Sequence, residues 1–361
     1  MQVQAWQMVA PGAPLERVAR EVDERALPGD RVLVEVAGCG VCHTDLGFLY
    51  EGVRTRHPLP LTLGHEIAGR VVAAGADGAD LLGRAVVVPA VVPCGRCDAC
   101  RAGRGAICPR QFFPGNDDHG GFASHVVVPS RGLSVVDEAR LAAANVSLAS
   151  LSVVADAVST PYQAIVDAGL APGDLAVFVG AGGVGGFGVQ LAAALGARVV
   201  ALDVDAGRLD RLLGATLRLD AAGDPRAIRG HVADFAKREG VGSRGWRIFE
   251  TSGSPKGQEL AFGLLGPGAH LGVVGFTREK VSVRLSNLMA FDATARGTWG
   301  CAPEHYPAIV ELVLSGRVVL GPFVEERSLG DAPRVLEALR RHELTRRPVL
   351  VPDFDREESE R

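Results

Sequence analysis

A stretch without any charged side chain, from Leu175 to Ala197, constrains the fold of this chain more than any other feature. A run of this length is compatible with a membrane span or with buried elements of a globular domain. Seven glycines lie within it, and they cluster as a turn between two shorter apolar pieces. We therefore predict a strand at Leu175–Gly180, a helix at Val184–Leu195 and no membrane span.

Strand and helix patterns continue to alternate after this unit, which indicates a parallel, doubly wound sheet of the α/β class in residues 158–299. The further elements that we expect are a strand at Arg198–Val204, a helix at Ala206–Leu213, and strands at Trp246–Glu250, His270–Gly275 and Ala295–Gly300.

The turn itself reads Gly180-Ala-Gly182-Gly183-Val184-Gly185. Glycines in this pattern permit a tight turn and let the backbone approach a pyrophosphate, while the helix N-terminus supplies unpaired N–H groups. Asp203 ends the following strand, where a carboxylate accepts hydrogen bonds from a ribose 2′-OH and repels a 2′-phosphate. The pattern predicts an NAD site; a packing turn followed by an N-cap Asp is the structural alternative.

Residues 1–157 show a different pattern, with short β-branched runs separated by turns that contain Gly and Pro. This spacing predicts an antiparallel, barrel-like domain. Its clearest strands are Val32–Val36, Ile67–Ala73, Ala85–Val92 and His125–Pro129. After Pro303 we expect helices at Tyr306–Ser315 and Ala332–His342, a strand at Arg347–Val351 that rejoins the first domain, and a frayed, charged tail at Asp353–Arg361.

Overall composition narrows the class of protein. A chain of 361 residues predicts about two domains, and 47% hydrophobic with 22% charged residues is typical of globular proteins. A net charge of −4 gives no field that would gather nucleic acid. The N-terminus shows no signal peptide, and seven cysteines without an obvious disulfide framework suit metal binding in a reducing compartment. A cytoplasmic location is therefore expected.

Four of these cysteines lie close together as Cys94, Cys97, Cys100 and Cys108. Four thiolates close a tetrahedral zinc site and leave no position open for chemistry, so we predict a structural zinc ion here. An iron–sulfur cluster is the alternative.

A second candidate metal site begins at Cys42, just past the strand at Val32–Val36. A thiolate at a strand end can hold zinc, and the hydroxyl of Thr44 can reach a zinc-bound oxygen and carry its proton. The carboxylate of Asp45 stands one residue further on. A turn with an incidental buried thiol is the structural alternative.

A catalytic zinc needs further protein ligands and one open position. His65 supplies an imidazole, and the adjoining Glu66 can lie beside the metal or exchange onto it. Asp156 stands in an apolar run, where an unpaired carboxylate is unfavourable unless a cation accompanies it. A structural histidine and a helix cap or buried salt bridge are the alternatives.

In their order and spacing these elements resemble the zinc-dependent medium-chain alcohol dehydrogenases. The resemblance implies a GroES-like catalytic domain in residues 1–157 and 300–361, with a Rossmann domain in residues 158–299. The resemblance in order and spacing covers residues 30 to 351. The matching stretches are Gly40–Asp45, Gly64–Glu66, the four-cysteine segment, His119–Ala123, and Gly180–Gly185 with Asp203.

By motif position the resemblance assigns Cys42, His65 and Asp156 to the catalytic zinc. It assigns Thr44 to the proton relay and Asp45 to the carboxylate that orients the zinc-bound histidine. Glu66, which adjoins His65, is expected beside the metal, as described above.

The resemblance also implies that Thr160 contacts the nicotinamide and that Arg347 lies near the pyrophosphate. Two positions depart from the family pattern. Asp156 stands where many members have Cys, which is chemically acceptable because zinc also takes oxygen ligands. Gly47 replaces the histidine that ends the proton relay in many members, so the proton must leave through water, the cofactor ribose or another side chain.

Longer stretches resemble members of this family that oxidise a cyclic β-hydroxyacyl-CoA thioester. Arg54, Arg56 and His57 follow the zinc-binding turn, and guanidinium groups there would bind CoA phosphates. A solvated basic loop is the alternative. The stretches are Val53–His65, Asp156–Gln163, Asn287–Thr294 and Leu344–Pro348.

We therefore expect an NAD-dependent secondary-alcohol dehydrogenase with two Zn²⁺ per chain. Its partners would be a small-molecule substrate, with a CoA thioester favoured, and further copies of itself as a dimer or tetramer. The alternatives are a general zinc alcohol or polyol dehydrogenase, a zinc lyase or hydratase on the same scaffold, and a non-catalytic NAD sensor stabilised by zinc.

Overall fold

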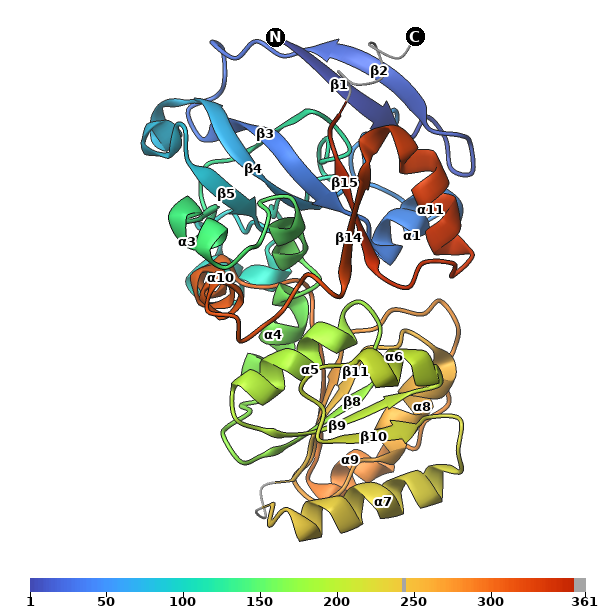
Figure 1. Cartoon of the computed structure of the whole chain (residues 1–361). Coiled ribbons are helices and arrows are strands. Elements are labelled where there is room, and N and C mark those ends of the chain that lie inside the picture. The colour runs from blue at the N-terminus through green and yellow to red at the C-terminus, as the bar shows by residue number, and fades with distance from the viewer. Residues whose placement is uncertain (242–244, 354–361) are drawn as a thin grey trace. The chain divides into compact units, whose positions relative to one another are not determined.

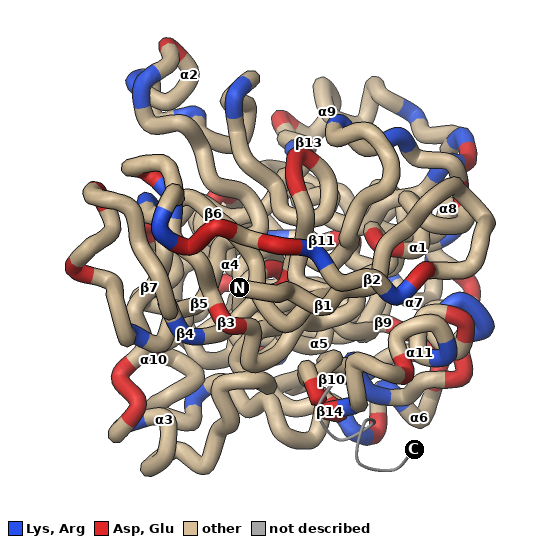
Figure 2. Tube along the Cα trace, turned by 90° about the horizontal axis from the view of Figure 1, so that it is seen from above, with Lys and Arg blue, Asp and Glu red and all other residues tan. Residues whose placement is uncertain are grey.

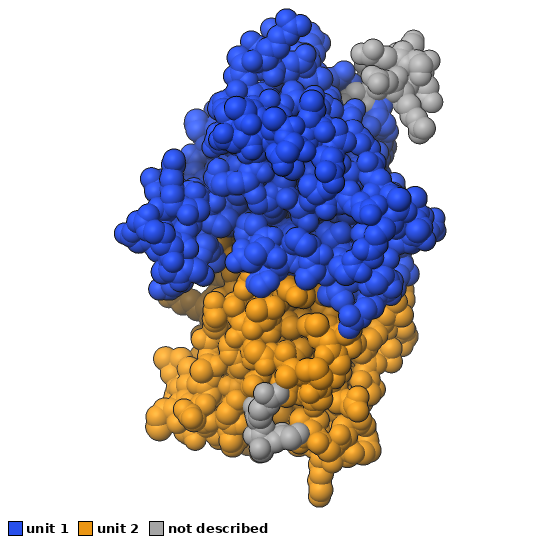
Figure 3. Space-filling model, turned by 90° about the vertical axis from the view of Figure 1, so that its left-hand side faces the viewer, with its two compact units in different colours: residues 1–159, 300–361 blue, residues 160–299 orange. Residues whose placement is uncertain are grey.

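The computed structural model describes residues 1–241 and 245–353 (Figure 1). The chain divides into two compact units, residues 1–159 with 300–361 (unit 1) and residues 160–299 (unit 2), as Figure 3 shows. The division falls at 159/160, close to the boundary at 157/158 that the sequence pattern predicts. Most of the tail that we expect to be frayed, residues 354–361, lies outside the described residues.

Unit 2 is built on a parallel sheet with the strand order β10-β9-β8-β11-β12-β13. The chain runs from β8 outward to β9 and β10, and then returns to the other side of β8 as β11. This reversal confirms the doubly wound sheet and makes a topological switch point between β8 and β11. The strands are β8 (Leu175–Val179), β9 (Arg198–Asp203), β10 (Leu217–Asp220), β11 (Arg247–Glu250), β12 (His270–Val273) and β13 (Thr294–Gly297).

The charge-free stretch forms β8, a turn and α5, so the prediction of a strand and a helix is confirmed. Every residue of β8 is buried, and Phe178 stacks on Phe249 of β11 with ring centroids 4.7 Å apart. The helices of this part of the chain are α4 (Ser159–Asp167), α5 (Gly185–Ala194), α6 (Ala206–Arg211), α7 (Pro225–Arg238), α8 (Pro255–Gly263) and α9 (Ser286–Phe291).

Unit 1 contains a sheet with the order β14-β15-β3-β4-β5-β7, and β6 pairs with another part of β3. The pairs are antiparallel except for β14 with β15. Val349 of β15 pairs with Gly40 of β3, which confirms that the C-terminal strand rejoins the first domain. The strands are β3 (Arg31–Gly40), β4 (Glu66–Ala74), β5 (Ala85–Val88), β6 (His125–Pro129), β7 (Ser134–Val135), β14 (Val324–Ser328) and β15 (Arg347–Val351), with a separate hairpin of β1 (Gln2–Gln7) and β2 (Glu16–Glu21).

The helices of unit 1 are short and pack around this sheet (Figure 1). Its core joins the strands to α11, since Ile67, Phe122 and Leu336 belong to one cluster of buried side chains. The α-helices are α1 (His43–Tyr50), α2 (Asp98–Arg101), α3 (Glu138–Ala143), α10 (Tyr306–Leu314) and α11 (Ala332–Arg340), and the 3₁₀-helices are η1 (Ala76–Leu81), η2 (Gly105–Ile107), η3 (Ser150–Ala155), η4 (Pro303–His305) and η5 (Leu329–Asp331).

Charges of both signs are interspersed along the chain, as Figure 2 shows for β2, where Arg17 and Arg20 lie between Glu16 and Glu21. This mixture agrees with the small net charge that the sequence gives. Within the described ranges, the structure contains no helix that is both long and apolar enough to span a membrane.

Candidate zinc and dinucleotide sites

Cys42 lies in the turn between β3 and α1, and Asp45 holds this turn in place. One oxygen of the Asp45 carboxylate accepts the backbone N–H of Cys42 over 2.9 Å, and the other accepts the N–H of Gly64 over 3.2 Å. The carboxylate thereby fixes the two loops that carry Cys42 and His65. Thr44 stands in the first turn of α1, with its Oγ1 3.7 Å from the Cys42 Sγ.

The structure brings the predicted ligands Cys42, His65 and Asp156 together. Nε2 of His65 lies 3.5 Å from Oδ2 of Asp156, and that oxygen lies 3.8 Å from Sγ of Cys42. The other ring nitrogen, Nδ1, lies 3.4 Å from Oδ1 of Asp45. One ligand atom from each of Cys42, His65, Glu66 and Asp156 can be chosen so that all lie within 4.8 Å of one another.

The electrostatics of this cluster fit a metal ion. His65 is 1% exposed, and neither ring nitrogen has a hydrogen-bond partner among the described residues. Burial lowers the pKa of His65, but Asp45, Asp156 and Cys42 more than offset this and raise it well above its usual value. The pocket therefore favours a positive charge beside a thiol, an imidazole and a carboxylate, which is a donor set that zinc accepts.

Asp156 directly follows η3, and Tyr306 of α10 is hydrogen-bonded to the last residue of this helix. The Tyr306 hydroxyl donates to the carbonyl of Ala155 over 2.6 Å, and Ser159 Oγ lies 3.2 Å from the same hydroxyl. Tyr306 is fully buried. Sequence reasoning missed this residue, because nothing in its helical surroundings marks a side chain that reaches a segment so distant along the chain.

Glu66 is fully buried and engaged by Arg347 of β15. Nε of Arg347 donates to Oε2 of Glu66 over 2.8 Å, a terminal nitrogen donates to Oε1, and the backbone N–H of Ala157 donates to Oε1 over 3.1 Å. Burial disfavours the charged guanidinium, but Glu66 outweighs this effect and raises the pKa of Arg347 above its usual value. The predicted contact of Arg347 with a pyrophosphate stays a prediction.

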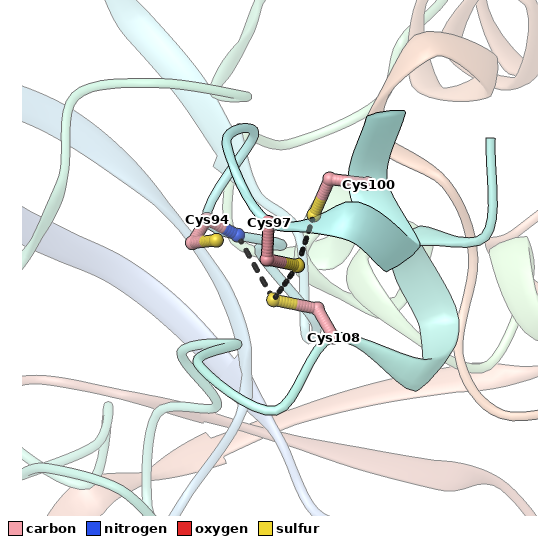
Figure 4. Close-up of side chains that lie close together, drawn as sticks. All are labelled: Cys94, Cys97, Cys100 and Cys108. Carbon is pink, nitrogen blue, oxygen red and sulfur yellow. Dashed lines mark hydrogen bonds between the residues drawn. The ribbon is translucent and has the colours of Figure 1, made fainter. Parts of the chain in front are cut away.

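The four-cysteine segment forms a second ligand cluster (Figure 4). Sγ of Cys97 lies 3.4 Å from that of Cys100 and 3.7 Å from that of Cys108, so these sulfurs are not disulfide-bonded. Thiolates that bind one tetrahedral zinc lie about 3.8 Å apart, given the usual Zn–S bond length. The backbone N–H of Arg96 lowers the pKa of Cys94 to about 6, whereas burial and the neighbouring thiols raise the pKa of Cys100 to about 11. Thiolates this close together repel one another, so a bound cation is needed for all four to ionise.

A third group, His57, Asp118 and His119, also has ligand atoms within 4.8 Å of one another. The N–H of Thr62 donates to Nδ1 of His119 over 3.1 Å, so the neutral ring carries its proton on Nε2. Burial and the nearby Arg20 lower the pKa of His119 to about 4. A neutral ring in this tautomer offers no lone pair at Nε2, and we assign no metal to this group.

In unit 2 the glycine-rich turn begins at Gly180, whose φ is 98°. A Cβ on Gly180 would lie 2.5 Å from the Ser252 nitrogen, and one on Gly185 would lie 1.9 Å from the Gly180 oxygen. Both positions therefore require glycine, and α5 begins at Gly185. Between them, Gly182 has nothing within 4 Å of a Cβ position, so the turn leaves open space at its tip, where Gly183 and Val184 follow.

Asp203 ends β9 and is 5% exposed. Its Oδ2 accepts the N–H of Ala181 over 2.7 Å, and its Oδ1 accepts the N–H of Asp205 over 2.9 Å. Arg208 lies 3.6 Å from Oδ1. Each carboxylate oxygen keeps a lone pair for a ribose hydroxyl. Thr160 lies in α4 and is 9% exposed, and its contact with the nicotinamide stays a prediction.

Comparison with family models gives two matches along the chain. Residues 28–138 match the alcohol dehydrogenase GroES-like domain, and residues 183–315 match the zinc-binding dehydrogenase domain. The two models together cover more than half of the chain.

Related proteins of known structure or activity are similar over almost the full length. An alcohol dehydrogenase of Geobacillus stearothermophilus is 27% identical over 92% of this chain and 94% of its own. The galactitol 1-phosphate 5-dehydrogenase of Escherichia coli strain K12 is 25% identical over 93% and 96%. The crystal structure of the alcohol dehydrogenase of Aeropyrum pernix has a TM-score of 0.83 and 29% identity, with 97% and 100% covered.

Metal analysis of the purified protein should return two zinc ions per chain, because two separate ligand sets are present. Cys94→Ser should remove one zinc and destabilise the fold by about 3 kcal/mol, since a structural site contributes folding energy. Cys42→Ser should weaken the other zinc and leave the fold intact, and Cys301→Ser, outside both clusters, should retain both. One zinc in the wild type, or iron with labile sulfide, would contradict this assignment.

Dinucleotide preference should follow from Asp203, because its carboxylate repels a 2′-phosphate. We expect NAD to be favoured over NADP by about tenfold or more in kcat/KM. Asp203→Ala should reduce the preference for NAD over NADP, mainly by weakening the binding of NAD. Asp210→Ala, at an exposed position of α6, should leave the preference unchanged. Equal kinetic constants for the two dinucleotides in the wild type would refute the role of Asp203.

Proposed function

Because the chain belongs to the zinc-dependent medium-chain alcohol dehydrogenase family, we propose that it oxidises a secondary alcohol to a ketone and transfers the hydride to NAD. Zinc-dependent alcohol or polyol dehydrogenase activity is what its relatives support. The observation that carries the proposal is the convergence of Cys42 and Asp156 on the buried imidazole of His65, whose Nε2 lies 3.5 Å from Oδ2 of Asp156 and makes no hydrogen bond among the described residues.

In this proposal Cys42, His65 and Asp156 hold the metal, and Asp45 orients His65. Bound zinc supplies a Lewis acid that lowers the pKa of an alcohol hydroxyl, and bound NAD accepts a hydride. Thr44 Oγ1, which lies 3.7 Å from the Cys42 sulfur, is placed to receive the hydroxyl proton.

The next step of proton release differs from that of many relatives, because Gly47 brings no side chain to α1. We propose that the proton leaves Thr44 through water, the cofactor ribose or another side chain. Burial raises the pKa of Glu66, and Arg347, which faces it, opposes this shift by stabilising the carboxylate.

Two other classes of function use parts of this site. A non-catalytic NAD sensor would need the cysteine cluster and the glycine-rich turn, but it has no use for Thr44 beside Cys42 and His65. A zinc lyase or hydratase would turn over without net change in NADH. Absorbance of NADH during incubation with a cyclic secondary alcohol separates the three, because only the dehydrogenase accumulates NADH.

The finer proposal concerns the substrate, which we propose is 6-hydroxycyclohex-1-ene-1-carbonyl-CoA, oxidised to the 6-oxo thioester in anaerobic benzoyl-CoA degradation. Its support is the resemblance of longer stretches described above together with one basic side chain. Arg56 is paired with Asp117 over 3.2 Å, whereas Arg54 is exposed and has no ion pair or hydrogen bond among the described residues. Arg54 is therefore the guanidinium in this loop that is available to a phosphate group.

A general polyol dehydrogenase is the second candidate, and the galactitol 1-phosphate 5-dehydrogenase of Escherichia coli favours it. That relative acts on a substrate with a phosphate group, so Arg54 is compatible with both candidates. The two differ in the part of the substrate that carries the phosphate.

Kinetics with a substrate series distinguish them. We expect the CoA thioester to be oxidised far better than its free acid, cyclohexanol or galactitol 1-phosphate. Arg54→Ala should raise the KM for the thioester by about fivefold through loss of a charge-assisted hydrogen bond, and Arg226→Ala, an exposed arginine of α7, should not. Equal use of the free acid would contradict the CoA assignment, and an unchanged KM in Arg54→Ala would remove Arg54 from it.

We also propose that the protein is a homo-oligomer, a dimer or a tetramer. The outermost strand of the parallel sheet, β13, has all four residues exposed, so its outer edge is open to further pairing. Exposed apolar side chains occur in the same segment of the chain, with Leu285 69%, Met289 78% and Trp299 52% exposed. Apolar surface of this kind marks protein interfaces.

Light scattering should therefore give a mass of two or four times the chain mass of 37.7 kDa. Met289→Asp should shift the equilibrium toward monomer, because a charge would be buried in the interface. Leu82→Asp, at a site 57% exposed in unit 1, is the matched control and should not shift it. A wild-type monomer at micromolar concentration would contradict the proposal.

A further inference from the structure

One peptide group of the glycine-rich turn is held at both of its ends. The carbonyl oxygen of Gly180 accepts a hydrogen bond from Oγ1 of Thr251 over 2.6 Å, which is the shorter contact of this hydroxyl, since the carbonyl oxygen of Val179 lies 3.2 Å away. The N–H of Ala181, which belongs to the same peptide group, donates to Oδ2 of Asp203 over 2.7 Å. Because a peptide group is planar, two bonds at opposite ends fix the orientation of the whole plane.

Thr251 reaches this carbonyl because of its place in the sheet. It directly follows β11, and its N–H donates to the Val179 oxygen over 2.9 Å, which extends the pairing of β8 with β11. These two strands border the switch point, where doubly wound sheets bind their ligands. A Cβ on Gly185 would lie 2.5 Å from Thr251 Oγ1, so this hydroxyl is wedged between the first and last glycines of the turn.

The chain that follows Thr251 is also fixed. Glu250 is fully buried, and its Oε1 accepts the N–H of Ser252 over 2.8 Å and the N–H of Gly253 over 3.1 Å. The Thr251 hydroxyl is thus presented from a backbone that is anchored on both sides.

We propose that Thr251 is a positioning residue of the dinucleotide site, whose hydroxyl acts with Asp203 to hold the Gly180–Ala181 peptide in the orientation that binds the cofactor. This inference rests on the proposed use of a nicotinamide dinucleotide. Glycine at position 180 allows the peptide to rotate when nothing holds its carbonyl. Such a rotation would move the Ala181 N–H away from Asp203 and displace the turn that receives the pyrophosphate. The Thr251 hydroxyl would therefore affect the binding of both the pyrophosphate and the ribose of the cofactor.

The test compares Thr251→Ala with Thr251→Ser, which both lose the methyl group but differ in the hydroxyl. NADH binding is measured by fluorescence titration without alcohol, and KM and kcat are measured with NAD. Thr251→Ala should weaken NADH binding and raise the KM for NAD by about three- to tenfold, with no fall in kcat at saturating NAD. Thr251→Ser should stay within about twofold of wild type, because it keeps the donor.

The matched control is Thr216→Ala, at an exposed threonine of unit 2 whose hydroxyl makes no hydrogen bond within the described ranges. It should bind NADH as the wild type does. Zinc content and the thermal midpoint are recorded for each variant, because a purely structural role would lower the midpoint without the selective effect on NADH. If Thr251→Ala does not fold, Thr251→Cys replaces it in the comparison with Thr251→Ser. The cysteine thiol is similar in size to the serine hydroxyl but is a poor hydrogen-bond donor.

Two results would overturn the inference: NADH binding by Thr251→Ala equal to that of wild type, or binding by Thr251→Ser as weak as that of Thr251→Ala. Failure of the wild type to bind NADH would instead reject the proposed dinucleotide function. The two failures are therefore distinguishable in the same titration.

Discussion

The buried ion pair between Glu66 and Arg347 is the interaction on which the zinc site of unit 1 depends. Burial of two charged groups is unfavourable unless they form an ion pair with good geometry. Here two guanidinium nitrogens of Arg347 donate hydrogen bonds to the carboxylate of Glu66. Glu66 opens β4 directly after His65, while Arg347 opens β15 near the other end of the chain. A Cβ on Gly40 would lie 2.0 Å from Glu66 Oε2, so the central strand leaves space for the pair. Loss of either charge would leave the other unpaired beside the metal ligands.

This ion pair joins the two sequence segments that make up unit 1. The proposed ligands come from the turn after β3, the residue before β4 and the residue after η3, and Arg347, which pairs with the neighbouring Glu66, comes from β15. The segment from residue 300 onward therefore returns to unit 1 after the residues of unit 2. Tyr306, in the same returning segment, donates to the carbonyl of Ala155 beside the proposed ligand Asp156. Residues 300–351 thus complete a site whose ligands all lie before residue 160.

Patterns within short segments of the sequence predicted several elements of the fold. The β8–α5 unit, β6 and the strand β15 follow from periodicity and turn residues, and the four-cysteine cluster follows from spacing within one short segment. Cys42, His65 and Asp156 are far apart in sequence, and it was the family resemblance that assigned them to one site. Helix α7 was missed although Asp224 caps it and Pro225 begins it, because its buried stripe of Ile228, Val232 and Phe235 is narrow within a polar segment. The partner of Arg347 and the role of Tyr306 depend on contacts between distant segments, which periodicity does not contain.

Both proposed sites rely on carboxylates that accept two backbone N–H groups from loops at strand ends. Asp45 accepts those of Cys42 and Gly64, Asp203 accepts those of Ala181 and Asp205, and Glu250 accepts those of the two residues after Thr251. Loops at strand ends have no ladder partners for these N–H groups, and unpaired buried donors are unfavourable. A carboxylate supplies the missing acceptors and makes the loop rigid before any ligand binds, which lowers the entropic cost of binding. The same acids that set charge at these sites therefore also set their geometry, so replacing one changes both at once.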